Sequence, residues 1–271
     1  MEKMYLNISD LHRLLIKMLK IIDDAAKKTS SKYYLHAGTA LGAIRHHDLI
    51  PWDDDADVII PIVDYRRMIS YLGSQDLGIF KLLYREKNAT RMQAKLVLKG
   101  QSEDLVCIDL FPMIGLPNNK KLQVKLDMIS SRIRWIYMYK KLRLSKSDKL
   151  WKRVIKNCVS LPFCVFPDKL LYKWFDQKVL YKYEFEASQY VTNPCGKYGI
   201  KNIIPKKWYG EGGKGKINEN YFPIPSDIER YLTHYYGDYL KCPDKFYQEK
   251  MISLKKEFTG TREEFKKCIQ P

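Results

Sequence analysis

Four aspartates stand within five consecutive positions of this chain, and their spacing is suited to binding a metal ion. They are Asp53, Asp54, Asp55 and Asp57, near the end of the stretch HAGTALGAIRHHDLIPWDDDADVIIP. Asp55 and Asp57 are two residues apart on a segment that we expect to be extended, so their side chains point to the same face. Two such carboxylates repel each other unless a proton or a cation lies between them. Mg²⁺ prefers oxygen ligands and commonly connects carboxylates to substrate phosphates, so it would suit this pair.

A polar turn with solvated aspartates is the alternative interpretation, and two further features weigh against it. Gly38 and Thr39 come at the start of a predicted helix, where free backbone N–H groups and the helix dipole favour a phosphate. Asp109 lies inside the apolar run VCIDLFPM, and a carboxylate there is costly to bury unless it is paired or bound to a metal. This order of elements is the layout of the nucleotidyltransferase fold. We therefore predict metal-assisted phosphoryl transfer, in which cations neutralise the phosphate.

The stretch HAGTALGAIRHHDLIPWDDDADVII also resembles the signature of the LicD family of phosphocholine transferases, which includes relatives of fukutin. The resemblance continues in VCIDLFPM and in FPIPSDIERYLTHYYGDYLKCP near the C-terminus. Members of the family transfer a phospho-alcohol from a nucleotide-activated donor, best known as CDP-choline, to a hydroxyl of a surface glycan. The resemblance implies a CDP-linked alcohol as donor. It implies as acceptor a glycan, lipid-linked, such as a lipopolysaccharide, capsule or teichoic acid precursor.

Carried over residue by residue, the resemblance assigns a site. It implies that Asp55, Asp57 and Asp109 hold a divalent metal, Mg²⁺ or Mn²⁺, and that they are the catalytic residues. Asp109 is the candidate base for the attacking hydroxyl. The residues implied to bind the donor phosphates are Gly38, Thr39, Arg45, His46 and Lys95.

The rest of the motif has no implied ligand role. Relatives more often carry Asp-Gly or Gly-Gly where this chain has His-Ala at residues 36–37, and x-Gly where it has His-Asp at residues 47–48. These departures concern the loop rather than the metal ligands. We interpret Asp53 as a residue that fixes the loop, and Asp54 as solvated or as a support for the ligands. Adjacent histidines on a helix diverge and no HExxH motif accompanies them, so zinc is disfavoured.

The composition indicates a folded protein with an anionic partner. Lysine and arginine outnumber the acidic residues 48 to 31, a net charge of +17, and 45% of the 271 residues are hydrophobic. The six cysteines form no CxxC pair and are typical of reduced cytoplasmic thiols. We see no signal peptide in the first residues and no apolar run long enough to span a membrane. We therefore expect a cytoplasmic protein, peripheral on the inner membrane face in one interpretation.

The predicted fold class is α/β (α+β): a nucleotidyltransferase-like mixed sheet with an N-terminal helix, a basic helical insertion and an aromatic C-terminal region. Helical spacing predicts the first helix over residues 9–29, with Ser9 or Asp10 as its N-cap. The predicted strands cover residues 56–61, 80–84, 92–98 and 105–111. We divide the chain into a catalytic core (1–118), a basic helical insertion (119–180) and a helical and loop region that completes the same domain (181–271).

Other interpretations of single segments stay open at this point. The basic insertion is either a solvated helix or a surface that docks on an anionic membrane, where each nearby Lys or Arg adds about 1 kcal/mol. Its Trp135 and the run VIKNCVSLPFCVF suit an interfacial helix. Aromatic side chains elsewhere invite a cation–π box for a quaternary ammonium group, although core packing is their ordinary role. These aromatic residues are Trp52, Trp208, Tyr209, Tyr235 and Tyr236.

Two other functions compete with the transferase. A D-x-D glycosyltransferase would use a nucleotide-sugar, but only about fifty residues precede the D-x-D and leave little room for its nucleotide-binding units. A non-enzymatic binder of membranes or nucleic acid would account for the net charge. It leaves three aspartates unexplained, because carboxylates repel a polyanion, so a nucleic-acid partner is disfavoured.

Overall fold

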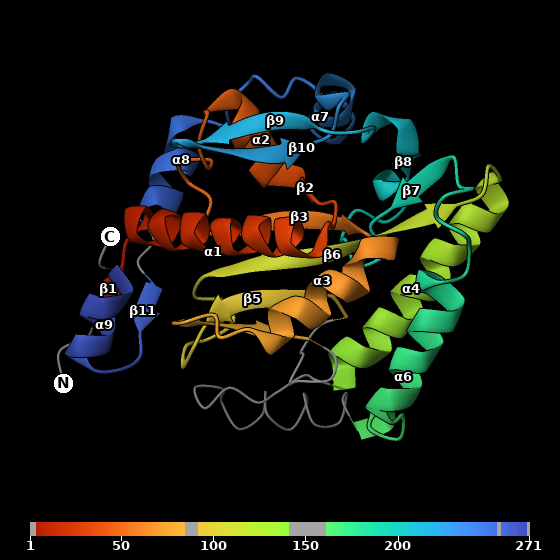
Figure 1. The fold of residues 1–271 in the computed structure, drawn as a ribbon, viewed down its shortest axis with the longest axis horizontal. Helices are drawn as coiled ribbons and strands as arrows, with labels where there is room; N and C mark the ends of the chain where they lie inside the picture. Colours follow the sequence, from red (N-terminus) through yellow and green to blue (C-terminus); the bar gives the residue numbers. More distant parts are fainter. Residues whose placement is uncertain (1–3, 85–91, 141–160, 254–255, 270–271) are drawn as a thin grey trace. The chain divides into compact units, whose positions relative to one another are not determined.

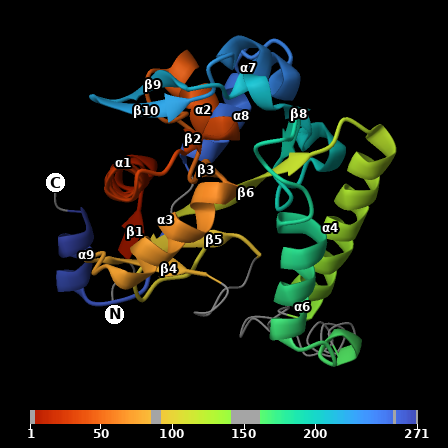
Figure 2. The ribbon, with the colours of Figure 1, turned by 45° about the vertical axis from the view of Figure 1, so that its right-hand side comes forward.

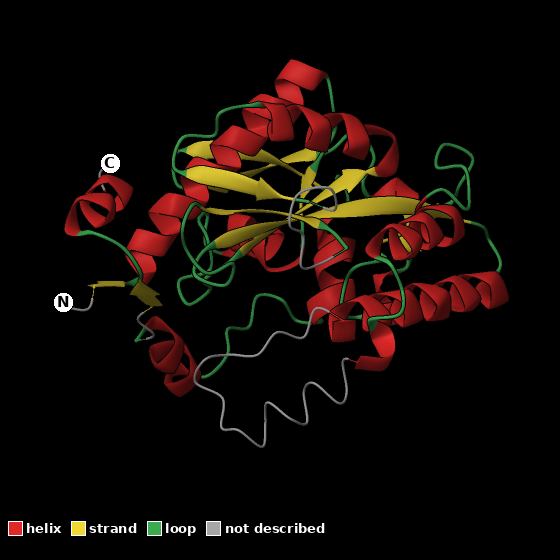
Figure 3. Cartoon of the chain, turned by 90° about the horizontal axis from the view of Figure 1, so that it is seen from below, coloured by secondary structure: helices red, strands yellow, loops and turns green. Residues whose placement is uncertain are grey.

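The computed structural model of this chain describes residues 4–84, 92–140, 161–253 and 256–269. Helices and strands occur together along the described chain, with most of the strands in one mixed sheet and the others in two small antiparallel pairs (Figure 3). This confirms the predicted α+β class. No helix among the described residues combines the length and the apolarity that a membrane crossing needs.

The chain divides into two compact units, which we describe separately. The first comprises Met1–Leu82, Lys95–Phe111 and Lys206–Pro271, and the second comprises Leu83–Ala94 and Pro112–Pro205. The candidate site residues all belong to the first unit. The three-part division at residues 118 and 180 stays a prediction.

The largest sheet has the strand order β2-β3-β6-β5-β4 along its main path. Its strands are β2 (Tyr34–Leu35), β3 (Ala56–Pro61), β6 (Cys107–Leu116), β5 (Ala94–Leu98) and β4 (Phe80–Leu83). β2 and β3 are antiparallel, with Tyr34 opposite Ile59. β3 and β5 are buried at nearly every position, as expected for interior strands with continuous apolar sequences. The four predicted strands are thus confirmed, with ends that shift by a few residues.

Two long helices of the first unit pack on each other, and a third carries the Gly-Thr pair. They are α1 (Ile8–Thr29), α3 (Ile62–Ser74) and α2 (Ala37–Arg45). The predicted N-cap of α1 is wrong by two or three positions: Asn7 is the cap, and its side chain accepts a hydrogen bond from Asp10 N at 2.9 Å. Asp10 Oδ2 accepts in return from Asn7 N at 3.2 Å. This reciprocal capping box satisfies two backbone donors at once, which a cap at Ser9 or Asp10 would not do.

The C-terminal part of the first unit packs on α2 and on the N-terminal strand. The hairpin of β9 (Gly213–Ile217) and β10 (Asn220–Ile224) lies beside α2 (Figure 1), and α7 (Ile228–Tyr236) also contacts this helix. A Cβ on Gly215 would lie 2.9 Å from Ala43 Cβ, so glycine allows the hairpin to approach. The strand β1 (Met4–Leu6) pairs with β11 (Lys256–Phe258). In the sequence, β11 follows α8 (Lys245–Ile252) and precedes α9 (Arg262–Ile269).

The second unit is largely helical. The longest helix among its described residues, α4 (Lys120–Lys140), lies beside α6 (Asp168–Phe175) (Figure 2). The hydroxyl groups of Tyr137 and Tyr172 are 2.7 Å apart between them, and Lys140 pairs with Asp168 at 2.6 Å. Short elements complete the unit: η1 (Leu161–Phe163), η2 (Asp176–Leu180), η3 (Gly199–Asn202), β7 (Tyr190–Thr192) and β8 (Ile204–Pro205). The first part of the predicted basic insertion is thus helical, and its residues 141–160 lie outside the described residues.

Candidate active site

Three neighbouring strands carry two of the predicted catalytic aspartates and one of the basic residues predicted to bind phosphate. Asp57 lies on β3, Asp109 on β6 and Lys95 on β5, and β6 lies between the other two strands in the sheet. Asp55 directly precedes β3. Residues that are far apart in the sequence thus meet in one part of the first unit.

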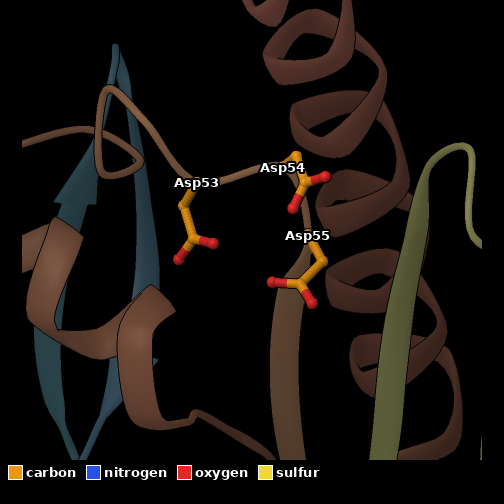
Figure 4. Close-up of side chains that lie close together, drawn as sticks. All are labelled: Asp53, Asp54 and Asp55. Carbon is orange, nitrogen blue, oxygen red and sulfur yellow. The ribbon is translucent and has the colours of Figure 1, made fainter. Parts of the chain in front are cut away.

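The connection between α2 and β3 gathers a set of carboxylates that differs from the predicted set. One side-chain oxygen of each of Asp53, Asp54 and Asp55 lies within 4.8 Å of the others, and the three carboxyl groups converge (Figure 4). Asp57 and Asp109 are not members of this group. The proximity of Asp53 and Asp54 to Asp55 was missed at the level of sequence, although the run of three aspartates was a visible signal for it.

The electrostatics of this group favour a cation. Burial, together with the neighbouring carboxylates of Asp55 and Asp54, raises the pKa of Asp53 to about 7. Without a cation, one of the three groups therefore retains a proton near neutral pH. A set of carboxylate oxygens is the type of ligand set that Mg²⁺ and Mn²⁺ prefer. The residues present therefore fit a hard divalent cation.

Asp109 shares its surroundings with Lys95 and with Asp55. Lys95 Nζ lies 3.9 Å from Asp109 Oδ1, and the two side chains are 9% and 16% exposed. Burial raises the pKa of the Cys107 thiol to about 12; Lys95 opposes this shift, and the carboxylates of Asp109 and Asp55 add to it. Asp55 leads into β3, which is the neighbour of β6 in the sheet, so its carboxylate comes from a segment next to the strand of Asp109. Burial acts to lower the pKa of Lys95, but Asp109, Cys107 and Asp104 together outweigh it and raise this pKa, so Lys95 stays a cation.

The start of α2 is bound to β3 through the backbone of Asp57. His36 N donates to Asp57 O at 2.9 Å, and Asp57 N donates to Thr39 Oγ1 at 2.8 Å. Thr39 is buried, and its hydroxyl serves this backbone contact. The Gly-Thr pair therefore positions the second aspartate of the D-x-D motif. A contact of Thr39 with a donor phosphate stays a prediction.

Gly38 allows a carboxylate to approach the first turn of α2. A Cβ at this position would lie 3.0 Å from Asp53 Oδ2, closer than nearly all real contacts of a Cβ atom. An anion beside a helix N-terminus is stabilised by the helix dipole. The position predicted to receive a donor phosphate is therefore adjacent to the carboxylate cluster.

A buried tyrosine from α7 holds the backbone at this helix start. Ala37 N donates to Tyr231 Oη at 3.0 Å, and Tyr231 Oη lies 2.7 Å from His36 Nδ1. The hydroxyl of Tyr231 therefore accepts from the backbone and also hydrogen-bonds to the ring of His36. Burial lowers the pKa of His36 to about 3 and raises that of Tyr231 well above 10, so both side chains stay neutral. Tyr231 lies in the C-terminal block SDIERYLTHYY, which was the sequence signal for it.

Arg45 and His46 lie at the other end of α2, roughly 10 Å along the helix axis from Gly38 at 1.5 Å per residue. Arg45 Nη1 donates to the carbonyl oxygen of Tyr239 at 2.9 Å, and Arg45 Nε donates to His46 Nε2 at 2.9 Å. The guanidinium group also lies over the ring of Trp52, 5.7 Å from its centroid. The structure thus does not gather these two residues with Gly38, and their contact with phosphate stays a prediction.

Comparison with known proteins agrees with this geometry. Residues 30–164 match the family described as LicD/FKTN/FKRP, nucleotidyltransferase domain. The chain is 27% identical to the lipopolysaccharide cholinephosphotransferase LicD of Haemophilus influenzae over 254 residues, which cover 88% of this chain and 89% of that protein. It is also 31% identical over 93 residues to an uncharacterized protein of Rickettsia prowazekii, a match that covers 27% of this chain and 35% of the other.

The backbone at Ala37 yields a first prediction. Ala37 has φ +46°, a left-handed conformation that costs a residue with a Cβ about 1–2 kcal/mol. Ala37→Gly should therefore stabilise the protein by about 1 kcal/mol in urea unfolding. Ala40→Gly is the matched control, since glycine in the interior of the same helix should destabilise it by about 0.5–1 kcal/mol. Equal destabilisation by both substitutions would contradict the argument.

A second prediction concerns the proton on the carboxylate cluster. In metal-free buffer, Asp55→Asn should lower the pKa of Asp53 from about 7 toward its ordinary value of 3.8, because it removes a like charge but leaves the burial. Carboxyl titration by NMR measures this shift, with Asp48→Asn as the control outside the cluster. Since the folded state retains this proton longer than the unfolded chain, the contribution of Asp53 to stability falls as the pH rises from about 4 to about 7. An ordinary carboxyl pKa for Asp53 in the wild type would refute this prediction.

Proposed function

On the premise that this chain belongs to the LicD family through its nucleotidyltransferase domain at residues 30–164, we propose that it transfers phosphocholine from CDP-choline to a hydroxyl of a cell-surface glycan such as lipopolysaccharide. The observation that carries the proposal is the placement of Asp57, Asp109 and Lys95 on three neighbouring strands, with Lys95 3.9 Å from Asp109, within the segment that matches the family. The near full-length similarity to a lipopolysaccharide cholinephosphotransferase supports the choice of substrates.

The proposed metal ligands are Asp55, Asp57 and Asp109. A bound Mg²⁺ or Mn²⁺ would neutralise the diphosphate of the donor and the departing CMP. The order of the strands supports this set, because β3 and β6 are neighbours and Asp55 leads into β3. Both the backbone N–H and the backbone carbonyl oxygen of Asp57 are hydrogen-bonded to the start of α2, which limits the movement of this proposed ligand.

We assign the predicted site residues roles in binding the donor and in accepting a proton. The N–H groups at the start of α2, at Gly38, would bind a donor phosphate, and Lys95 supplies a positive charge next to Asp109. The acceptor hydroxyl oxygen forms a bond to the phosphorus of the phosphocholine group while the bond to the CMP oxygen breaks. Asp109 accepts the proton of the attacking hydroxyl. Arg45 and His46 are further proposed contacts for the donor.

The proposed location is the inner face of a membrane, where a lipid-linked acceptor would be found. The exposed face of α4 carries Lys121, Lys125 and Arg132 together with Met128 and Trp135, which is 57% exposed. Near Trp135, the ring of Tyr139 stacks on that of Phe163 along a groove that Arg132 also lines. Basic and aromatic side chains on one helix face suit an anionic lipid surface. This surface belongs to the second unit.

The donor can be identified by calorimetry of the purified protein against CDP-choline, CDP-glycerol, CDP-ribitol and UDP-glucose, each with and without Mg²⁺. We expect metal-dependent binding of CDP-choline that Asp57→Ala weakens at least about tenfold, as for loss of a metal ligand or its support. Asp76→Ala is the matched control, since Asp76 pairs with Lys99 at the surface. Binding of UDP-glucose alone would replace the proposal with a glycosyltransferase, and metal-independent binding would remove the metal from it.

The membrane surface is tested by flotation with vesicles that contain an anionic phospholipid. Arg132→Ala should weaken binding by about 1 kcal/mol, roughly fivefold, because a cation near the lipid surface is lost. Trp135→Ala should also weaken binding, through loss of an interfacial aromatic side chain. Lys99→Ala makes the same charge change in the first unit and should have no effect. Unchanged flotation of the Arg132 and Trp135 variants would contradict the proposed surface.

A further inference from the structure

Lys256, in the C-terminal strand β11, contacts the carboxylate cluster. Its Nζ atom lies 2.6 Å from Asp54 Oδ2, and the two side chains are 23% and 29% exposed. The same ammonium group donates to the backbone oxygen of Asp104 at 2.6 Å. Lys256 therefore joins the segment that carries the consecutive aspartates to the segment that precedes β6. Both segments lead into strands with proposed metal ligands.

The backbone around Lys256 is fixed independently of its side chain. β11 pairs with the N-terminal strand β1, with Tyr5 opposite Glu257. Three residues beyond Lys256, Thr259 N donates to Gln101 Oε1 at 2.9 Å, and Gln101 Nε2 donates to Thr259 O at 2.6 Å. The ammonium group is thus presented to Asp54 by a strand that is paired with β1 and is followed directly by a residue bound to Gln101. It is not a lone flexible side chain on the surface.

The cluster offers two overlapping sets of ligands to a divalent cation. One consists of the consecutive residues 53–55, whose oxygens lie within 4.8 Å of one another. The other is the proposed set, in which Asp55 acts with Asp57 on β3 and Asp109 on β6. A carboxylate that is neutralised by a lysine is a poorer metal ligand, because the cation must displace the ammonium group. Lys256 therefore lowers the affinity of residues 53–55 for a cation, whereas its ion pair with Asp54 does not involve Asp57 or Asp109 of the proposed set.

We propose that Lys256 is a positioning residue that withholds Asp54 from the metal and so directs the cation to the carboxylates of β3 and β6. This inference rests on the proposed function, since it specifies how that site selects its metal ligands. Asp54 then acts as the counter-ion of Lys256 and holds the C-terminal strand against the site. The run of three aspartates is thereby divided between metal binding and structural support.

The test is Mn²⁺ binding, measured by calorimetry on the full chain without nucleotide. Asp54→Asn should bind Mn²⁺ within about twofold of the wild type, since Asp54 is not a ligand. Lys256→Met should bind Mn²⁺ roughly tenfold more tightly, because the released carboxylate becomes available to the cation. The double variant Asp54→Asn/Lys256→Met should return to the wild-type affinity. Lys99→Met removes a lysine that pairs with Asp76 at 3.4 Å and should leave the affinity unchanged.

Two results would overturn the inference: a loss of Mn²⁺ affinity of about tenfold in Asp54→Asn, which would make Asp54 a ligand, or an unchanged affinity in Lys256→Met. Lys256→Arg, which keeps the charge, should bind Mn²⁺ like the wild type, and thermal unfolding of each variant verifies that it folds. Because no donor is present, the result is independent of the reaction. If phosphocholine transfer is not found but the Mn²⁺ pattern holds, the proposed function fails while the role of Lys256 stands.

Discussion

The candidate site depends on the attachment of the first turn of α2 to β3. The backbone of Asp57 accepts from His36 N and donates to Thr39 Oγ1, so the helix start and the D-x-D strand cannot move separately. A helix N-terminus attracts anions, whereas the carboxylates on the strand attract cations. This contact holds the two regions side by side. In the proposed function, this arrangement places the anionic donor next to the cation, as phosphoryl transfer requires.

The acidic connection after this helix is stable only because its charges are offset. Asp53 is protonated more readily than an ordinary carboxyl group because it is buried among carboxylates, and Asp54 is paired with Lys256. Asp109 in turn lies near Lys95. A chain with a net charge of +17 thus places cations around its densest acidic segment, while other basic residues remain on exposed surfaces such as α4.

The C-terminal region supplies the contacts that hold the site in place. Tyr231 binds the backbone at the left-handed Ala37, the carbonyl oxygen of Tyr239 binds Arg45, and Lys256 binds Asp54. Lys256 is half-buried, and Tyr231 is fully buried. Tyr231 and Tyr239 lie in the C-terminal block that resembles the family, far in the sequence from the proposed metal ligands, which all lie before residue 110. The aromatic residues there pack mainly against one another and against His36.

The sequence by itself determined the fold class and the main strands and made the site residues predictable, because these depend on local information. Gly38, Thr39 and the D-x-D motif lie within twenty residues, and Asp109 stands out in an apolar strand. Only the tertiary structure decided that Asp53 converges on its neighbours and that Tyr231 and Lys256 reach the site. Ala37 and Tyr231 are 194 residues apart in the sequence. Packing and strand pairing, which have no local signature, select partners over such separations.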